Sequence, residues 1–227
     1  MKNDDSETEK FFSQYRQDQY LETKVFKGKR DGVFVDIGAN DGVSLSNTYF
    51  FEKFRSWRGL CIEPIPAIFQ QLQKNRSCIC VNGCIGPTPG EREFLWVKGP
   101  CEMFSGFPET FSDRHRRRIS ESLAEVGGST ETIIVPTYRL GDLLEQHGMP
   151  QIDYCSIDTE GGELGILQSI DFKRYQIDYL TVENNYPRGL IQRYMAGIGY
   201  HRFFRKGADG FYRRTGRTGW LRNLLGF

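Results

Sequence analysis

The ten residues VFVDIGANDG, from Val33 to Gly42, constrain the fold of this chain more than any other stretch. The apolar and β-branched residues up to Ile37 predict a buried strand. Gly38 and Gly42 then predict a turn in which bulky side chains would be in the way. A strand that ends in such a turn is typical of an α/β sheet whose ligand approaches the backbone at that point.

The neighbouring segments continue an alternation of strands and helices. Helical spacing over 13–26 precedes the first strand. After the turn, helices are predicted at 46–54 and 67–76, and strands at 59–63 and 78–86. This order predicts a parallel sheet with right-handed crossover connections.

The second half of the chain extends the same pattern. Strands are predicted at 132–136, 152–158 and 178–184, helices at 139–148 and 190–199, and a terminal hairpin at 200–214. An alternating stretch at 91–97 predicts an antiparallel strand that elaborates the sheet. We therefore expect an α/β fold with a mostly parallel central sheet, helices on both faces and a terminal antiparallel hairpin.

Length and local composition suggest one domain with short appendages. A chain of 227 residues is long enough for one substantial α/β domain. We expect a polar N-terminal segment at 1–12, the domain at 13–212 and a basic tail at 213–227. Within the domain, the periodicity weakens over 99–130, which we interpret as an insertion or substrate lid.

The basic tail places apolar side chains on one helical face beside arginines. These side chains are Trp220, Leu221, Leu224 and Leu225. Three roles fit this spacing: peripheral contact with a membrane surface, contact between subunits, and docking on the domain itself.

Charge and cysteine usage exclude several classes of protein. The formal net charge is +1, so the total charge does not favour nucleic acid as a partner. The six cysteines lie mostly in apolar runs and are interpreted as reduced core thiols, because their spacing is poor for zinc. The sequence shows no apolar signal region and no run long enough for a membrane helix, so we expect a cytoplasmic location.

The glycine turn indicates a particular ligand. It lacks the G-x-G-x-x-G pattern of dinucleotide-binding folds, which leaves S-adenosylmethionine (SAM) as the interpretation that fits an adenosine joined to an amino acid. Asp36 would bind the ammonium group, and Gly38 and Gly42 would let the backbone approach the ligand. Glu63, at the end of the second strand, would accept hydrogen bonds from the ribose hydroxyls. The alternative is a tight strand-to-helix turn without a ligand.

Further carboxylates follow later strands and reach the same edge of the sheet. Asp158 and Glu160 are candidate catalytic groups, because crowded acids raise one another's pKa and a general base suits methyl transfer to a hydroxyl. With Glu183 they are also candidate ligands for a divalent metal. Glu163 is better explained as an acid at a helix N-terminus.

Polar residues at two turns are candidates for binding the acceptor. Glu183 and Asn184 follow a buried strand, where they would line a substrate pocket or satisfy turn amides. Ser46 and Asn47 stand where a helix begins, so capping explains at least one of them.

The insertion contributes candidates of its own. His115 could act as a base, although a histidine within a run of arginines is commonly part of a solvated face. Arg116 and its neighbours could bind a carboxylate or phosphate of a nucleotide-sugar or glycan.

Together, the motifs resemble one family. FVDIGANDGVSLSNTYFFEK, WRGLCIEP, IDYCSIDTEGGELGILQSIDF and LTVENNYP are similar, in this order, to the FkbM family of SAM-dependent methyltransferases. The resemblance spans about residues 13–212 and implies a Rossmann-like methyltransferase fold with SAM as cofactor. By the same resemblance, the methionine side of the cofactor and its ribose would contact Asp36, Gly38, Ala39, Asn40, Asp41, Gly42, Glu63 and Pro64.

The resemblance also implies a reaction, the transfer of a methyl group to a hydroxyl of a sugar, a glycan or a related small metabolite. Two alternatives stay open: an O-methyltransferase for a lipid or polyketide-like acceptor, and a non-catalytic binding or trafficking module that keeps the fold.

Overall fold

The computed structural model describes residues 10–186 and 189–216. The tail residues Trp220, Leu221, Leu224 and Leu225 lie outside these ranges, so their predicted helical face stays a prediction. Within the described ranges, no helix combines the length and apolar character needed to cross a membrane. The six cysteines are free thiols, and Cys61, Cys84, Cys101 and Cys155 are buried.

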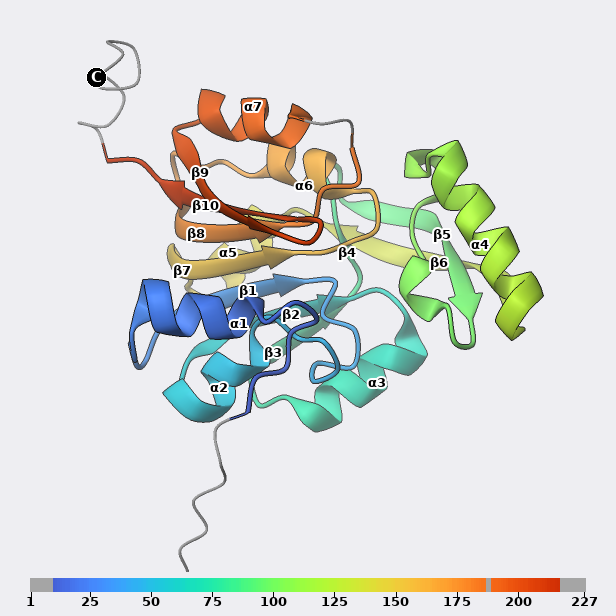
Figure 1. The fold of residues 1–227 in the computed structure, drawn as a ribbon, viewed down its shortest axis with the longest axis horizontal. Coiled ribbons are helices and arrows are strands. Elements are labelled where there is room, and N and C mark those ends of the chain that lie inside the picture. Colours follow the sequence, from blue (N-terminus) through green and yellow to red (C-terminus); the bar gives the residue numbers. More distant parts are fainter. Residues whose placement is uncertain (1–9, 187–188, 217–227) are drawn as a thin grey trace, which may run out of the picture.

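A seven-stranded sheet forms the centre of the molecule (Figure 1). Its spatial order is β3-β2-β1-β7-β8-β10-β9. The strands are β1 (Val33–Ile37), β2 (Arg58–Glu63), β3 (Ile79–Asn82), β7 (Gln151–Ile157), β8 (Gln176–Val182), β9 (Tyr200–Lys206) and β10 (Asp209–Arg214). All pairs from β3 to β8 are parallel, whereas β10 is antiparallel to both β8 and β9. The predicted mostly parallel sheet and terminal hairpin are confirmed.

Alternate residues of the strands face opposite layers of helices. From β1, Phe34 packs in one core cluster with residues of the N-terminal helices, while Val35 and Ile37 pack in another with residues of the later helices. The first layer contains α1 (Gln17–Tyr20), its π-helical continuation (Leu21–Phe26), α2 (Tyr49–Arg55) and α3 (Pro66–Asn75). The second contains α5 (Leu140–Gln146), α6 (Glu163–Ser169) and α7 (Leu190–Gly197). Because successive side chains of a strand point to opposite faces, helices pack on both faces of the sheet, as predicted.

The N-terminal residues begin to pack before residue 13. The ring of Phe11 stacks on Phe50, with centroids 4.6 Å apart, and Phe12 meets Tyr49 edge to face at 4.8 Å. Phe11 and Phe12 are therefore partly buried against the domain core.

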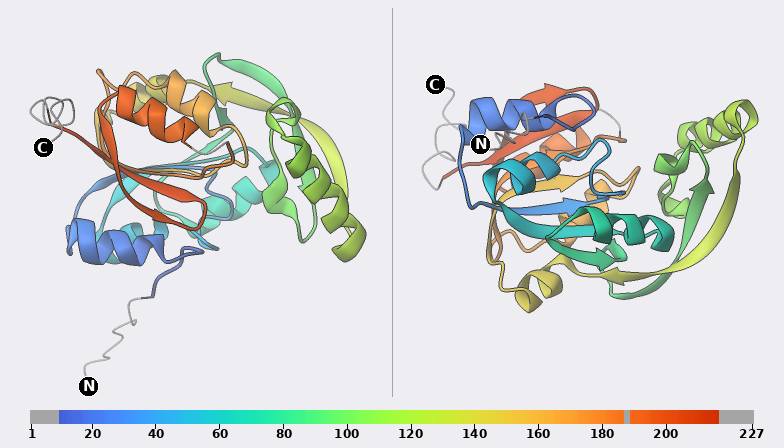
Figure 2. Two further views of the ribbon diagram at one scale, coloured as in Figure 1. Left: turned by 45° about the horizontal axis from the view of Figure 1, so that its top comes forward. Right: turned by 90° about the horizontal axis from the view of Figure 1, so that it is seen from below.

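A second, smaller sheet projects from one end of the main sheet (Figures 1 and 2). It contains β4 (Cys84–Ile85), β5 (Gly90–Lys98) and β6 (Ser129–Tyr138) in the order β4-β6-β5. Between β5 and β6 come two 3-10 turns (Glu102–Phe104 and Pro108–Thr110) and α4 (Asp113–Val126). We call residues 84–138 the lobe. The predicted antiparallel strand at 91–97 is confirmed as part of β5, but it pairs with β6 in this second sheet and does not elaborate the main sheet.

The lobe has a small core of its own. Val97 from β5, Phe104 and Phe111 from the loop region and Ile119 from α4 are buried together. The segment outside the main sheet is consequently longer than 99–130, and that range forms the part of the lobe that carries α4.

Candidate active site

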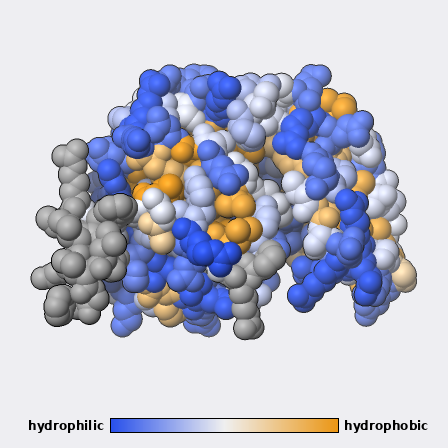
Figure 3. Space-filling model, turned by 90° about the horizontal axis from the view of Figure 1, so that it is seen from above, coloured by the Kyte–Doolittle hydropathy of each residue, from blue (hydrophilic) through white to orange (hydrophobic). Residues whose placement is uncertain are grey.

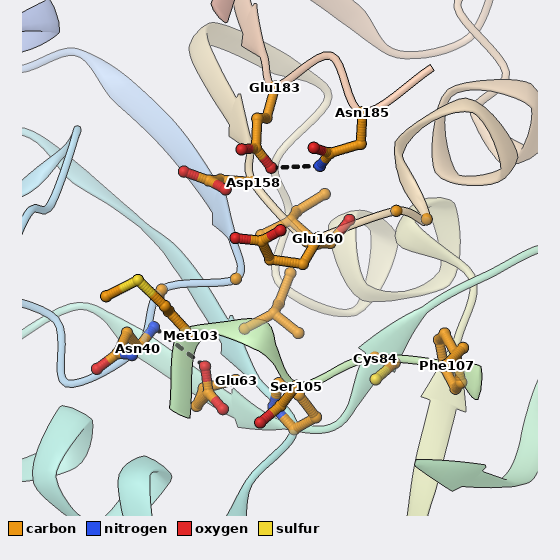
Figure 4. Close-up of a pocket in the computed structure, with 18 of the residues that line it drawn as sticks. Asn40, Glu63, Cys84, Met103, Ser105, Phe107, Asp158, Glu160, Glu183 and Asn185 are labelled. Atoms are coloured by element: carbon orange, nitrogen blue, oxygen red, sulfur yellow. Dashed lines mark hydrogen bonds between the residues drawn. The ribbon is translucent and has the colours of Figure 1, made fainter. Parts of the chain in front are cut away.

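A cavity of about 1250 Å³ lies between the carboxyl ends of the central strands and the lobe. The ends of β1, β2, β7 and β8 and the turns after them supply one wall, and the lobe supplies the other (Figure 4). The cavity spans the point where β1 stands between β2 and β7 and the strand order reverses, which is the usual ligand site of an open α/β sheet.

The turn after β1 needs its glycines for contacts within the protein. Gly38 has a φ of +86°, and a Cβ atom there would stand 1.9 Å from the backbone oxygen of Asp158. Gly42 has a φ of +83°, and a Cβ atom there would stand 2.6 Å from Leu72 Cδ1. The sequence suggested that these glycines admit a ligand, whereas the structure shows that they first admit neighbouring protein atoms.

The polar residues of this turn shape its backbone. Asp41 Oδ1 accepts hydrogen bonds from the amides of Val43 and Ser44, at 2.8 and 2.7 Å. Burial opposes ionisation of Asp41, but the bonds from Ser44 and Val43 lower its pKa overall. Ala39 is buried, and Asn40 has a φ of +49°. Ala39, Asn40 and Asp41 stand between the two glycines and line the cavity.

Asp36 is buried at the end of β1 and still reaches the cavity wall. Its Oδ2 atom accepts a hydrogen bond of 2.6 Å from Thr48 Oγ1. Burial raises the pKa of Asp36, and the positive charge of Arg76 works against this rise.

Arg76 is a buried cation that the sequence did not single out. Its guanidinium donates to Glu52 Oε2 at 2.6 Å, to the backbone oxygen of Gly42 at 3.0 Å and to Thr48 Oγ1 at 2.9 Å. It therefore ties the end of α3 to the glycine turn and to the start of α2. No local pattern indicates this role, because the partners lie 24 to 34 residues away along the chain.

Glu63 is buried where β2 ends, and both its oxygens accept backbone amides. Oε2 accepts from Asn40 N at 3.0 Å and Oε1 from Ile65 N at 2.9 Å. Burial raises the pKa of Glu63 to about 7, although these two hydrogen bonds oppose the rise. Pro64 follows it in the cavity wall. The carboxylate thus joins the glycine turn to the β2–α3 turn and keeps further lone pairs for a ligand.

Ser46 and Asn47 also line the cavity, with different bonding. Ser46 Oγ accepts from the amides of Thr48 and Tyr49, at 3.2 and 3.1 Å, so it stabilises the turn that leads into α2, while Thr48 occupies the N-cap position without a side-chain cap. Asn47 Nδ2 donates to Ser156 Oγ at 3.0 Å, while its buried Oδ1 atom has no hydrogen-bond partner among the described residues.

Three carboxylates meet on the opposite side of the cavity, as the sequence predicted (Figure 4). Asp158 follows β7, Glu160 stands in the next turn and Glu183 follows β8. Surrounding protein and the charge of Glu183 raise the pKa of Asp158 well above its usual value, even though its side chain is exposed to the cavity. Burial and the charge of Glu183 raise the pKa of Glu160 to about 8.

Glu160 combines backbone strain with an unpaired oxygen. Its φ is +51°, which is costly for a residue with a side chain, and such conformations cluster at functional sites. Its buried Oε2 atom has no hydrogen-bond partner within the described chain. His115 Nδ1, from α4, is 3.7 Å from that atom.

His115 is half-buried and faces the cavity rather than bulk solvent. Its Nε2 atom is 3.0 Å from the backbone oxygen of Phe104, and its ring centroid is 4.5 Å from that of Phe111. Because a carbonyl oxygen only accepts, Nε2 carries the proton, which leaves Nδ1 directed toward Glu160. The alternative of a purely solvated histidine does not describe this environment.

The other acids and amides of this region have supporting contacts. Glu163 is fully buried, and its Oε1 atom accepts from Gly161 N at 2.8 Å and from Asn185 Nδ2 at 3.1 Å. Asn185 also donates to Glu183 Oε2 at 2.6 Å. Asn184 lines the cavity beside Glu183. The sequence interpretation placed Glu163 only as an acid at a helix N-terminus. Its hydrogen bonds show that it also stabilises the turn that carries Glu160.

Two expectations differ from the structure. Arg116 does not line the cavity, because its guanidinium donates to the backbone oxygen of Pro108; Arg114 and Arg118 line the cavity instead. The proposed metal ligands Asp158, Glu160 and Glu183 do not form a metal centre, since no group of three or more His, Cys, Asp or Glu side chains in the described ranges is arranged to hold an ion.

The sheet order, the reversed terminal hairpin and the cavity at the switch point define a Rossmann-like α/β protein. The model of the methyltransferase FkbM domain matches residues 36–205. This match covers most of the chain, and the chain therefore belongs to the FkbM methyltransferase family.

Individual proteins show the same likeness. Methyltransferase sdnD from Sordaria araneosa is 25% identical over 179 residues, which are 69% of this chain and 67% of that protein. A crystal structure of methyltransferase FkbM from Methylobacillus flagellatus KT has a TM-score of 0.48 at 14% identity, and the alignment covers 81% of this chain but only 43% of that one. The N-terminal domain of human METTL16, solved in complex with SAH, has a TM-score of 0.43 at 13% identity over 87% of this chain and 67% of that one.

Proposed function

We propose that this chain is a SAM-dependent O-methyltransferase that acts on a hydroxyl of a sugar, a glycan or a related small metabolite. One observation carries the proposal: a single cavity joins the wall formed by Asp36 and Glu63 to the acids Asp158, Glu160 and Glu183. Its volume of about 1250 Å³ exceeds the roughly 300–1,000 Å³ typical of a site for one small ligand. This supports room for a cofactor and an acceptor side by side.

The residues around Glu63 fit the cofactor. Each Glu63 oxygen accepts one amide and can accept a second hydrogen bond, as two ribose hydroxyls require. Asp36 offers a negative charge to an ammonium group, and the unpartnered Asn47 Oδ1 offers a further acceptor nearby on the wall. SAM, when bound, supplies a methyl group activated by its sulfonium.

The opposite wall fits the work of a general base. A base is most effective when its pKa lies near the working pH, and the pKa of Glu160 is raised to about 8. Glu160 would accept the proton of the acceptor hydroxyl, with His115 Nδ1 facing the same oxygen. Asp158 and Glu183 would hold the hydroxyl, and the charge of Glu183 would help to keep Glu160 basic.

The lobe wall also favours a second class of acceptor. Met103 has 47% of its surface exposed, and it lines the cavity together with the half-buried Phe107. An acceptor with an apolar portion, such as a lipid or polyketide-like alcohol, would bury these side chains. The acceptor screen should therefore contain both sugars and apolar alcohols.

Calorimetric titration with SAM and with SAH tests the cofactor first. Wild type, Glu63→Ala and the control Glu91→Ala, at an exposed position of β5, are compared. We expect the control to bind like wild type and Glu63→Ala to bind at least about tenfold more weakly, since two ligand hydrogen bonds are lost. No binding by wild type would overturn the proposal, and binding without methyl transfer to any acceptor would favour the non-catalytic module.

A further inference from the structure

Three arginines of α4 share one face of the helix. Arg114, Arg117 and Arg118 are separated by three and four residues, a spacing that makes side chains neighbours on a helix. With Glu121 they surround a hollow of about 360 Å³. Arg114 and Arg118 also line the active-site cavity, so the hollow and the cavity share two of their lining residues.

The positive charge of this face is not balanced by ion pairs. Among the residues that the structure describes, no carboxylate lies within ion-pair distance of Arg114, Arg117 or Arg118. Nearby arginines behave differently, because Arg92 pairs with Glu109 and Arg116 donates to the backbone oxygen of Pro108.

One of the three guanidinium groups is held in place. The Arg118 guanidinium lies 3.9 Å from the centroid of the Phe104 ring, on the lobe side of the cavity. Stacking of this kind orients the plane of the group and leaves its N–H donors available at the edges. In Figure 3, hydrophilic side chains, coloured blue, occur on the side of the molecule that carries the lobe as well as elsewhere on this face.

The two sides of the cavity thus differ in charge and chemistry. Asp158, Glu160 and Glu183 lie on the sheet side, and the three arginines lie on the rim. An anionic group would be attracted by the arginines of the rim and repelled by the charge of Glu183, which also raises the pKa of Asp158 and Glu160. A ligand that carries both an anionic group and a hydroxyl would therefore enter in one orientation, with its hydroxyl toward the acids.

We propose that the acceptor carries a phosphate or carboxylate group, and that Arg114, Arg117 and Arg118 bind this group and so present the acceptor hydroxyl to Asp158 and Glu160. This inference rests on the proposed methyltransferase function and specifies its acceptor. Guanidinium groups suit both anions because they donate paired hydrogen bonds to adjacent oxygens.

The test measures anion binding separately from cofactor binding. The full chain is titrated with inorganic phosphate and, in a second arm, with acetate, and binding is followed by amide shifts in ¹H–¹⁵N NMR spectra. The proteins are wild type, the double variant Arg114→Glu with Arg117→Glu, and the control Arg58→Glu, which changes an exposed residue at the opposite end of β2. SAH binding is measured on the same samples.

We expect phosphate or acetate to shift amides of α4 in wild type and in the control. Affinity should fall at least about tenfold in the double variant, because charge-assisted bonds are replaced by repulsion. It should also fall as salt rises from about 0.05 to 0.5 M, as screening requires. The stronger of the two arms identifies the anion class.

Equal anion binding by wild type and the double variant would overturn the inference. So would the absence of binding in both arms. If SAH binds normally in either case, the proposed function stands and only the anionic acceptor is rejected. If SAH does not bind wild type, the proposed function fails on its own, whatever the anion arms show.

Discussion

Gly38 lies against the backbone carbonyl of Asp158, so closely that a Cβ atom at residue 38 would stand 1.9 Å from that oxygen. The amide of Asp158 in turn donates to the backbone oxygen of Ile37 at 3.0 Å. The glycine turn after β1 and the turn after β7 that carries the acids are therefore one packed unit, and a change in either turn displaces the other.

Gly38→Ala should destabilise the protein strongly. The added methyl group collides with backbone, and φ is +86°, so we expect a loss of about 2–5 kcal/mol in the free energy of unfolding. Gly165→Ala is the control, because its Cβ atom would meet nothing within 4 Å in α6, and it should gain up to about 1 kcal/mol. Urea denaturation measures both, and similar effects of the two variants would contradict this packing.

Arg76→Met should cost about 3–5 kcal/mol, because it leaves buried carboxylates without their cation. Glu52 and Asp36 are the acids concerned. Arg76→Lys should not restore stability, since one ammonium cannot reach Glu52, Gly42 and Thr48 together. Arg58→Met, at an exposed position, should stay within about 0.5 kcal/mol of wild type. Full rescue by lysine would show that charge alone matters.

Stability should fall as pH rises through the range in which Glu163 ionises. Burial raises the pKa of Glu163 from 4.5 to about 7, so the folded protein keeps a proton that the unfolded chain releases. Its contribution is therefore complete below pH 4.5 and is lost progressively up to about pH 7. Glu163→Gln should reduce this slope, while Glu91→Gln, at an exposed position, should not. Denaturation curves measured across this pH range test the prediction. If stability depends on pH in Glu163→Gln as it does in wild type, Glu163 is not the group responsible.

Glu160→Gln should lower the rate of methyl transfer about 100-fold or more, the usual contribution of a general base. In wild type, the rate should rise with pH as Glu160 loses its proton near pH 8. The variant should lose that rise while its affinity for SAM is unchanged. His115→Asn should shift the midpoint of the pH profile, since Nδ1 faces Glu160 at 3.7 Å, whereas His201→Asn, on β9, should not. A variant profile parallel to that of wild type would exclude Glu160 as the base.

Local pattern was sufficient for the elements of the fold. Apolar runs and helical spacing located the strands and helices of the main sheet. A buried strand and an amphipathic helix each have a characteristic spacing of apolar residues in the sequence. The same patterns predicted that four acids share one edge of the sheet, because the carboxyl ends of parallel strands meet there. These acids are Asp36, Glu63, Asp158 and Glu183, and all four line the cavity. The pairing of β5 with β6 was missed, because roughly 30 residues of loop and helix separate the two strands.

The sequence alone determined which residue types follow which strand, and hence the family, the sheet and the acids at its edge. Tertiary structure alone decided what those residues touch. It set Gly38 on the Asp158 carbonyl, Arg76 beneath the glycine turn, His115 opposite Glu160, and Arg114 rather than Arg116 in the cavity wall. The physical reason is that periodicity records which face of an element is buried, whereas contacts between distant segments depend on how those faces pack together.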